Sequence, residues 1–460
     1  MKDVFRHLKR PGPALLLLLC ASTASYAQQS ASYTQKTTPA EETTAAGPGS
    51  DDGVALQASP DTGDSNSAGA TGAAVSDGTG DPRQLSSSPA TAAYLSLDIK
   101  PYMDNIAAIE QVEGAFAIGL AEPLLSAGLA LQRNGAHEQA IRLFKRGVHL
   151  TRINEGLHSP QQIAMLQGEI ASHVALNAYE DADERQRYLH RIQSRSLSDA
   201  FRGDAYMQYA RWQRQAYEAG IGEDPFNRLQ RMLSLYRMAL AEYVDLEGIE
   251  SPKQLDPLYG MLRASYLISG FVGQTTSSGF STQWSNDAAT RRAAYRGQRY
   301  KEGEAIIRRI FDVYGAQPEF SIEEQARVSQ MLADWQLWNG KRDEALQTYA
   351  AIDGELAAME GAQVIREKLF GRPHPLPALE GVRAFPMPKE EQEGYLLLEF
   401  GVTDRGRVTD LTRLDTHPAN DEIAGRVIRR LKQTPFRPRI SDGAPVATQG
   451  LRWAYDTSIW

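Results

Sequence analysis

The chain has 460 residues, 42% of them hydrophobic, and is long enough for more than one domain with its own core. Its 49 Lys and Arg residues stand against 57 Asp and Glu residues, which gives a formal net charge of -8 at pH 7. This balance argues against nucleic acid as a partner, because proteins that bind phosphate backbones present a basic surface.

Residues 1–27 have the order of segments found in an export signal. Basic residues precede the apolar run from Ala14 to Ala21, and Ser25-Tyr26-Ala27 supplies a small-x-small cleavage pattern. A transmembrane anchor needs about 20 apolar residues, and this run is roughly half that length. We therefore predict a signal peptide, a mature chain that begins at Gln28 and a periplasmic location. An N-terminus that stays uncut as a membrane anchor is the alternative.

Cys20 is the single cysteine and lies inside the predicted signal peptide. The mature chain would then have no disulfide, thiolate nucleophile or cysteine metal ligand. Lipidation of Cys20 is a second reading, but Leu19 is bulky where lipoprotein signals usually carry a small residue.

Residues 28–94 are mostly Ser, Thr, Ala, Gly, Asp, Gln and Pro. Such a segment cannot bury enough apolar surface to offset the loss of chain entropy. We expect a disordered low-complexity linker, acting as a tether or as a plain spacer.

Residues 95–372 change to apolar positions at helical spacing, separated by short Gly, Pro and Asp stretches. Gly128, Leu131, Gly135, Ala140 and Phe144 fall at the offsets of a tetratricopeptide helix-turn-helix unit. A second copy is formed by Ala333, Gly340, Ala345 and Tyr349. The pattern predicts a mostly α, TPR-like α-solenoid, with a helical bundle as the alternative; such arrays bind peptides or protein segments.

An internal repeat supports this prediction. The segment 155–162 recurs as 247–254 at an ungapped shift of 92 residues, and at the same shift Phe144 aligns with Tyr236. In each copy a Ser-Pro pair, at Ser159 or Ser251, can start a helix. Between the units, residues 270–285 are so rich in Gly, Ser and Thr that we expect a surface loop there.

A proline-rich linker at 373–385 leads to a C-terminal domain at 386–460, where the apolar period becomes two. Leu396 to Val402 alternates as a strand, and a turn at 403–406 leads to a second strand from Arg407 to about Leu414. A helix with an apolar stripe follows, and Leu451 to Tyr455 forms a last strand. The order is β-β-α-β, a small α+β domain with one helix over one face of an antiparallel sheet.

This domain resembles the TonB C-terminal domain family over roughly residues 386–455. The likeness lies in four blocks in order: Gly394 to Val402 with Gly406 to Val408, Asp421 to Ala424, Pro435 to Pro438, and Gly443 to Val446. The chain departs from the family at Asp415-Thr416, where a small polar pair is usual, and shows neither the transmembrane helix nor the charged proline-rich spacer of TonB transducers.

The resemblance implies a domain that binds partners by lending a sheet edge to an extended peptide, in TonB itself the plug-side segment of outer-membrane receptors. An edge strand offers unpaired backbone donors and acceptors for this purpose. We predict the partner-binding edge in the last strand, with Arg452 facing outward: Leu451, Arg452, Trp453, Ala454 and Tyr455.

Motifs for catalysis, metal binding or cofactor binding are missing from the sequence. The eight histidines are scattered, and no phosphate-binding loop, nucleophile elbow or dinucleotide fingerprint occurs. Carboxylate clusters such as Asp181, Asp183 and Glu184 are expected to be solvated helix faces rather than acid/base pairs.

These observations predict a non-catalytic adaptor of the bacterial cell envelope. Its partners would be protein or peptide segments, outer-membrane receptors or other envelope proteins among them, with membrane association at most through the N-terminus or a partner. The alternative is a TonB-type energy transducer with an uncleaved anchor. A third hypothesis is an envelope enzyme with a pocket between array and C-terminal domain, which would require ionisable groups that converge in a cleft.

Overall fold

The computed structural model describes residues 99–222, 224–270, 282–382 and 388–457, with the backbone alone for 282–298. The predicted signal peptide and low-complexity linker lie outside these ranges. Within them, no helix is both long and apolar enough to cross a membrane.

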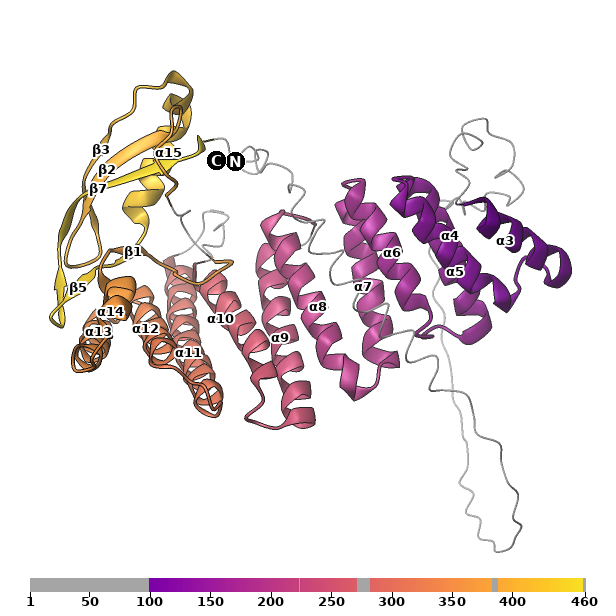
Figure 1. Ribbon diagram of the computed structural model, residues 1–460, viewed down its shortest axis with the longest axis horizontal. Coiled ribbons are helices and arrows are strands. Elements are labelled where there is room, and N and C mark those ends of the chain that lie inside the picture. Colours follow the sequence, from indigo (N-terminus) through magenta and orange to yellow (C-terminus); the bar gives the residue numbers. More distant parts are fainter. Residues whose placement is uncertain (1–98, 223, 271–281, 383–387, 458–460) are drawn as a thin grey trace, which may run out of the picture.

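Residues 100–370 form a series of helices in which each helix packs against the next one along the chain (Figure 1). The α-helices are α3 (Lys100–Glu113), α4 (Ala121–Arg133), α5 (His137–Glu155), α6 (Gln162–Ala175), α7 (Tyr179–Ser196), α8 (Asp199–Glu218), α9 (Pro225–Glu247), α10 (Leu255–Gly270), α11 (Thr282–Gly315), α12 (Ile322–Trp338), α13 (Arg342–Ala357) and α14 (Gln363–Phe370). Short 3-10 helices are η2 (Ile118–Leu120) and η3 (Pro252–Gln254).

The predicted helical repeats are confirmed by the turns and the packing of this array. Gly135 joins α4 to α5 at φ 76°, and Gly340 joins α12 to α13 at φ 80°, a left-handed conformation that glycine adopts without strain. Ala140 and Ala345, five residues after each turn, are fully buried. One apolar core runs from α3 to α12, and a second one joins α12, α13 and α14, as expected for a solenoid whose units stack on their neighbours.

Aromatic rings packed against helical glycines hold consecutive helices together. The Phe144 ring on α5 lies between Gly128 on α4 and Gly168 on α6, so close that a Cβ at Gly168 would lie 2.6 Å from a ring carbon. At the 92-residue shift, Tyr236 on α9 packs against Gly260 on α10 in the same way, at 2.5 Å. The internal repeat therefore repeats a packing arrangement as well as a sequence.

The repeated segments Glu155–Gln162 and Glu247–Gln254 also form the same turn. In both, the serine hydroxyl donates to the glutamate at 2.7 Å and accepts from a backbone N–H two residues later at 3.2 Å. The glutamine at the end of each segment is buried and donates to the carbonyl of the segment's glycine. The predicted helix start is confirmed at Ser251, which caps η3 with Pro252 at its first position. At Ser159 it is wrong in detail, because the serine bonds the turn before α6, and α6 itself begins at Gln162.

The loop expected at 270–285 is shorter than predicted at both ends. Gly270 is the last residue of α10, and Thr282 to Ser285 belong to α11; residues 271–281 lie outside the described ranges. Ser and Thr cost a helix only about half a kcal/mol each, so a helix of 34 residues that packs on α10 and α12 extends over them.

The C-terminal domain contains a three-stranded antiparallel sheet in the order β3-β2-β7, covered on one face by α15. The predicted β-β-α-β order is confirmed for these four elements. The inward side chains of β2, from Leu396 to Val402 at alternate positions, are at most 1% exposed and pack against Val427 and Leu431 of the helix. Their bounds are β2 (Leu396–Val402), β3 (Val408–Arg413), α15 (Asp421–Gln433) and β7 (Thr448–Tyr455).

Short strands between α15 and β7 fix this domain onto the end of the array (Figure 1). The hairpin of β5 and β6 turns at Asp442 and Gly443, both with positive φ, and Ile440 on it packs among α12–α14 residues. The linker takes part, because His374 and Pro375 pair with Phe436 and Arg437. The bounds are β1 (His374–Pro375), β4 (Phe436–Arg437), β5 (Arg439–Ser441) and β6 (Ala444–Val446), with η4 (Pro418–Asn420) before α15.

Replacing Gly168 with Ala should destabilise the array, because the new Cβ would collide with the Phe144 ring. Overpacking of this kind costs about 1–3 kcal/mol, so the midpoint of chemical unfolding should fall. The matched control is Gly354→Ala in α13, where a Cβ meets nothing within 4 Å and the substitution should be neutral or slightly stabilising. Equal effects of the two substitutions would contradict the ring-to-glycine packing.

Candidate functional site

The predicted binding strand lies at an edge of the sheet. β7 pairs with β2 on one side only, in the register Leu397 to Ala454 and Leu398 to Trp453. The Leu397 backbone is bonded to residues that follow β3, so the Ala454 carbonyl opposite it faces away from β2. By the alternation of a strand, the backbone of Arg452 faces outward too. We call this outer edge of β7, from Leu451 to Tyr455, the rim.

Most side chains of the rim residues are buried in the domain and are not available at its surface. Trp453 and Tyr455 are buried in the core under α15, and Ala454 is buried on the other face of the sheet. Arg452 is exposed, as predicted, and its Nε lies 2.9 Å from the Glu399 carboxylate on β2. A partner on the rim would therefore be recognised mainly by the β7 backbone.

One residue of the chain already occupies part of the rim. The Lys389 N–H donates to the Ala454 carbonyl at 2.9 Å, and the Lys389 ammonium lies 3.1 Å from Asp456. Among the residues that the structure describes, no other backbone group reaches the rim, so Arg452 keeps its outward donor and acceptor.

The opposite edge of the sheet is less suited to accept a strand. Its edge strand, β3, has a bulge where Thr409 and Thr412 oppose Gly401 and Glu399, and Asp410 within the bulge has φ 49°. Bulges bend an edge strand and interrupt its ladder of donors and acceptors. The rim on β7 is thus the better candidate.

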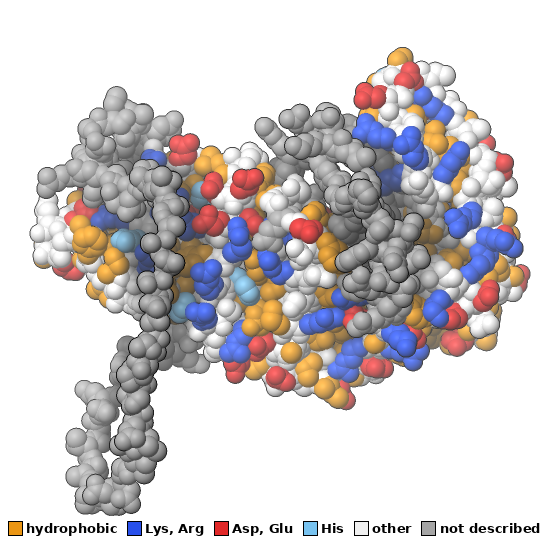
Figure 2. Space-filling view, turned by 180° about the vertical axis from the view of Figure 1, so that it is seen from behind, with side chains coloured by type: hydrophobic (Ala, Val, Ile, Leu, Met, Phe, Trp, Pro, Cys, Tyr) orange, Lys and Arg blue, Asp and Glu red, His pale blue; other side chains and the backbone are white. Residues whose placement is uncertain are grey.

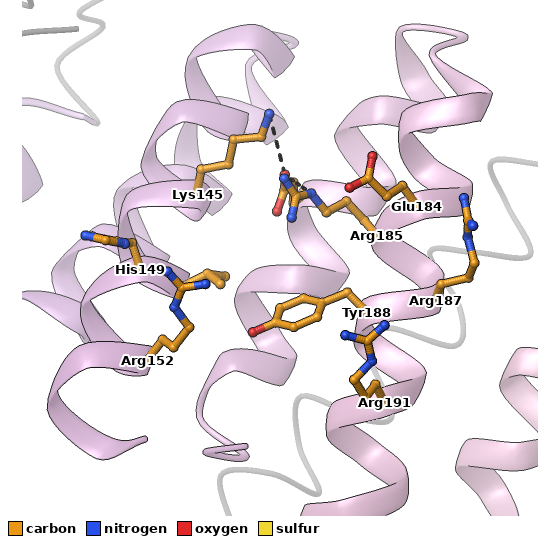
Figure 3. Close-up of a pocket in the computed structure, with 10 residues that line it drawn as sticks. Lys145, His149, Arg152, Glu184, Arg185, Arg187, Tyr188 and Arg191 are labelled. Carbon is orange, nitrogen blue, oxygen red and sulfur yellow. Dashed lines mark ion pairs between the residues drawn. The ribbon is translucent and has the colours of Figure 1, made fainter. Parts of the chain in front are cut away.

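A second candidate surface is a hollow of about 440 Å³ between α5 and α7, which we call the basic groove (Figure 3). Lys145, His149 and Arg152 line it from α5, and Tyr188 and Arg191 line it from α7. Six of its lining residues are basic and two, Glu169 and Glu184, are acidic. The basic ones are Lys145, His149, Arg152, Arg185, Arg187 and Arg191.

Glu169 on α6 forms the floor of the basic groove and is almost fully buried. Its Oε1 lies 2.9 Å from Arg185 Nε, 3.6 Å from His173 Nε2 and 3.8 Å from Lys145 Nζ. The carboxylate charge is therefore compensated inside the protein. Within the described part of the chain, Arg152 and Arg191 have no carboxylate within ion-pair distance.

The basic groove was not predicted from the sequence, although its signal is present there. Lys145, His149 and Arg152 follow one another at four and three residues, and Arg187 and Arg191 at four, so each set shares a helix face. What the sequence does not reveal is that α5 and α7 lie close enough for these faces to meet across α6.

One of the carboxylates expected on a solvated face is in fact buried. Asp183 is 3% exposed and accepts from both terminal nitrogens of Arg228 at 3.1 Å and from Trp212 Nε1 at 2.7 Å. Burial acts to raise the pKa of Asp183, but these hydrogen bonds outweigh it and the pKa is lowered. The prediction was wrong because Asp183 lies on the side of α7 that packs against α8, a contact that local sequence does not encode.

The junction between array and C-terminal domain is closed by a buried ion pair. Arg437 on β4 donates to both oxygens of Asp334 on α12 at 3.0 and 2.8 Å, and Tyr349 donates to Asp334 at 2.6 Å. Burial raises the pKa of Asp334, while Arg437 and Tyr349 favour its ionised form. These three ionisable groups are therefore bonded to one another. Across the described ranges, no group of His, Cys, Asp and Glu side chains is arranged to hold a metal ion.

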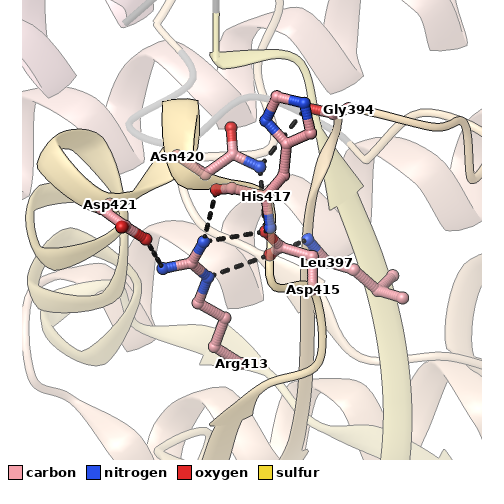
Figure 4. A network of polar contacts seen from close by, with 7 residues as sticks. All are labelled: Gly394, Leu397, Arg413, Asp415, His417, Asn420 and Asp421. Carbon is pink, nitrogen blue, oxygen red and sulfur yellow. Dashed lines mark hydrogen bonds and ion pairs between the residues drawn. The ribbon is translucent and has the colours of Figure 1, made fainter.

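Asp415, where the sequence departs from the TonB pattern, ties the sheet to α15 (Figure 4). Its carboxylate accepts from the backbone N–H of Leu397 at 3.0 Å, from the Arg413 guanidinium at 2.9 and 3.1 Å and from the Asn420 amide at 3.0 Å. Arg413 also pairs with Asp421, the first residue of α15, at 2.8 Å. Burial acts to raise the pKa of Asp415, but these donors outweigh it and lower the pKa to about 2.

No protein-family model matches the chain, and no curated protein matches it. Among solved structures, it is similar to the nearly identical TPR-like repeats of a Podosopora anserina protein described as a kinesin light chain, with 16% identity and a TM-score of 0.33, over 54% of this chain and 94% of that one. It is also similar to BtubC (BKLC) from P. vanneervenii, with 10% identity and a TM-score of 0.32, over 58% and 91% of the two chains. The helical repeat itself is established by this chain's own turn glycines and packing.

Replacing Asp415 with Asn should lower the free energy of unfolding of the C-terminal domain by about 2 kcal/mol at pH 7. Because folding lowers the Asp415 pKa from 3.8 to about 2, the ionised carboxylate stabilises the fold above pH 4. This stabilisation is lost as the pH falls from about 4 to about 2. The Asn variant should lack it at every pH. Thermal unfolding from pH 7 to pH 2 measures both effects.

The control for this experiment is Asp442→Asn. Asp442 is exposed at a turn position where Asn tolerates positive φ, and its ion pair with Arg366 is long, at 3.9 Å. An equal loss of stability in the control would show that Asp415 has no special role.

Proposed function

We propose that this chain is a non-catalytic adaptor of the bacterial cell envelope that binds protein segments. The rim carries the proposal, because Arg452 presents a backbone donor and acceptor that no described residue pairs with, at the edge of a folded sheet. An extended peptide can add to such an edge as a further strand through main-chain hydrogen bonds.

Two further features support a binding role. The array is a stack of helical repeats, an architecture that presents extended surfaces to protein partners. The Arg437–Asp334 pair and the β5–β6 hairpin attach the C-terminal domain to the end of this array. A partner on the rim is thereby held in a set orientation to a partner on the array.

The proposed partners of the rim are extended segments of envelope proteins, outer-membrane receptors among them. The order of β2, β3, α15 and β7, with the helix over one face, supports the likeness to the TonB C-terminal domain family on which this rests. In this proposal the chain binds such segments without transducing energy, and the export signal at 1–27 delivers it to the periplasm.

Replacing Arg452 with Pro should abolish partner binding at the rim and leave the sheet folded. The Arg452 N–H faces outward and makes no ladder bond, so proline removes only the donor that a new strand needs. The mature chain is immobilised, exposed to envelope extract, and the retained segments are located by crosslinking and mass spectrometry. Crosslinks to β7 should vanish in this variant and persist in Arg452→Ala, which keeps the N–H. Unchanged crosslinks in the proline variant would rule out strand addition.

In the same assay, a substitution at Lys389 should have the opposite effect and increase partner binding at the rim. Lys389→Pro removes the N–H that bonds Ala454 and opens the rim by one position, so partner capture should increase. Lys389→Ala keeps that N–H and loses only the ion pair with Asp456, so it should change capture little. A decrease with the proline variant would mean that Lys389 supports the rim rather than covering it.

Export can be tested on the protein as cells produce it. N-terminal sequencing of the mature chain should give a start at Gln28, because Ser25-Tyr26-Ala27 is the cleavage pattern. A chain that still starts at Met1 and sediments with the inner membrane would favour the anchored transducer instead.

A further inference from the structure

We infer that the basic groove between α5 and α7 binds an acidic, extended segment of a protein partner, at a site separate from the rim. This inference rests on the proposed scaffold function and adds to it the chemistry of one partner. Its basis is a hollow of about 440 Å³ that is lined by five Lys and Arg side chains and by His149, in a chain with a net charge of -8.

Charge compensation in the groove is incomplete. Arg185 lies against the floor carboxylate of Glu169 at 2.9 Å, and Arg187 reaches Asp183 at 3.8 Å. Arg152 and Arg191 extend into the groove from opposite helices, and no described carboxylate neutralises them. A guanidinium presents a planar fork of donors that matches a carboxylate, so these two side chains are suited to bind Asp or Glu of a partner.

The spacing of the cations fits an extended peptide. Lys145 and Arg152 are seven residues apart on α5, which corresponds to about 10 Å along the helix. In an extended chain the side chains on one face recur about every 7 Å, so flexible Glu side chains at alternate positions can reach cations that lie about 10 Å apart. A segment with carboxylates at alternate positions can therefore meet Lys145 and Arg152 along α5 and Arg191 across the groove.

Apolar and hydrogen-bonded groups shape the walls. Val148 lines the α5 side, and the Tyr188 ring lines the α7 side. The Tyr188 hydroxyl donates to Gln162 on α6 at 2.8 Å, which fixes the ring in place. The ring can cover the backbone or stem of a bound side chain while the cations hold its carboxylates.

A polypeptide fits these features better than a nucleic acid does. One carboxylate of the lining, Glu184, would repel a continuous phosphate backbone. On the face seen in Figure 2, Lys and Arg side chains alternate with Asp and Glu side chains over the array. The cations of the groove thus form a local site for separate carboxylates.

The test uses the full mature chain and two labelled peptides, one alternating Glu and Ser over eight residues and one alternating Gln and Ser. Fluorescence anisotropy should show that the acidic peptide binds, that salt weakens it, and that the amide peptide does not bind. Arg152→Gln with Arg191→Gln should weaken acidic-peptide binding by at least about tenfold. The control is Arg142→Gln with Arg327→Gln, two exposed array residues outside the groove, which changes the net charge equally.

Three results would overturn the inference. One is equal binding of the two peptides, and another is an equal loss in the control variant, which would indicate general charge attraction. The third is binding that emerges only after deletion of residues 28–94, which hold eight acidic and two basic residues, because the chain's own segment would then be the occupant. Arg452→Pro should leave acidic-peptide binding intact, so a failure at the groove and a failure at the rim can be told apart.

Discussion

The arrangement of the whole molecule depends on the buried ion pair between Asp334 and Arg437. Both side chains are at most 6% exposed, and Tyr349 completes the hydrogen bonding of the carboxylate. A buried pair of this kind stabilises little compared with a well-packed apolar junction, but loss of one partner leaves an uncompensated charge and costs about 3–5 kcal/mol. Around it, Ile440 packs with Tyr349 and Phe370, and the Gly443 N–H donates to Asp353 at 2.8 Å. The C-terminal domain is therefore held in one orientation on the array.

The two candidate surfaces recognise partners by different physics. The rim offers backbone donors and acceptors, which read the extended shape of a chain and depend little on its charge. The basic groove offers side-chain cations, whose attraction is long-ranged and screened by salt. In the proposed adaptor, association at the groove would be fast and adjustable by ionic strength, while association at the rim would depend on a strand that fits. The backbone of Lys389 already pairs with Ala454 on the rim. An incoming strand must either displace Lys389 or bind beside it.

Local pattern was enough to predict most elements, and contacts between distant elements account for what it missed. Gly135 and Gly340 predicted two helix pairs, because the turn between the helices of each pair requires a left-handed residue. The alternation from Leu396 to Val402 predicted β2, because one face of this strand is buried. The expected solvation of Asp183 failed because the side chain meets Arg228, 45 residues later. Asp334 and Arg437 are 103 residues apart, and neither sequence neighbourhood signals the other. The groove likewise needs α5 beside α7, which periodicity alone does not determine.

The 92-residue internal repeat has a consequence for how such a molecule can vary. Phe144 on Gly168 and Tyr236 on Gly260 form the same seam, and the turns 155–162 and 247–254 present the same ends to the next helix. The contact between α5 and α6 is equivalent to the contact between α9 and α10. A block of four helices could therefore be gained or lost between them, and the helices brought together would still pack in the same way. Such a change would lengthen or shorten the array and so change the distance between its two ends. The fixed junction at the C-terminal domain would be untouched.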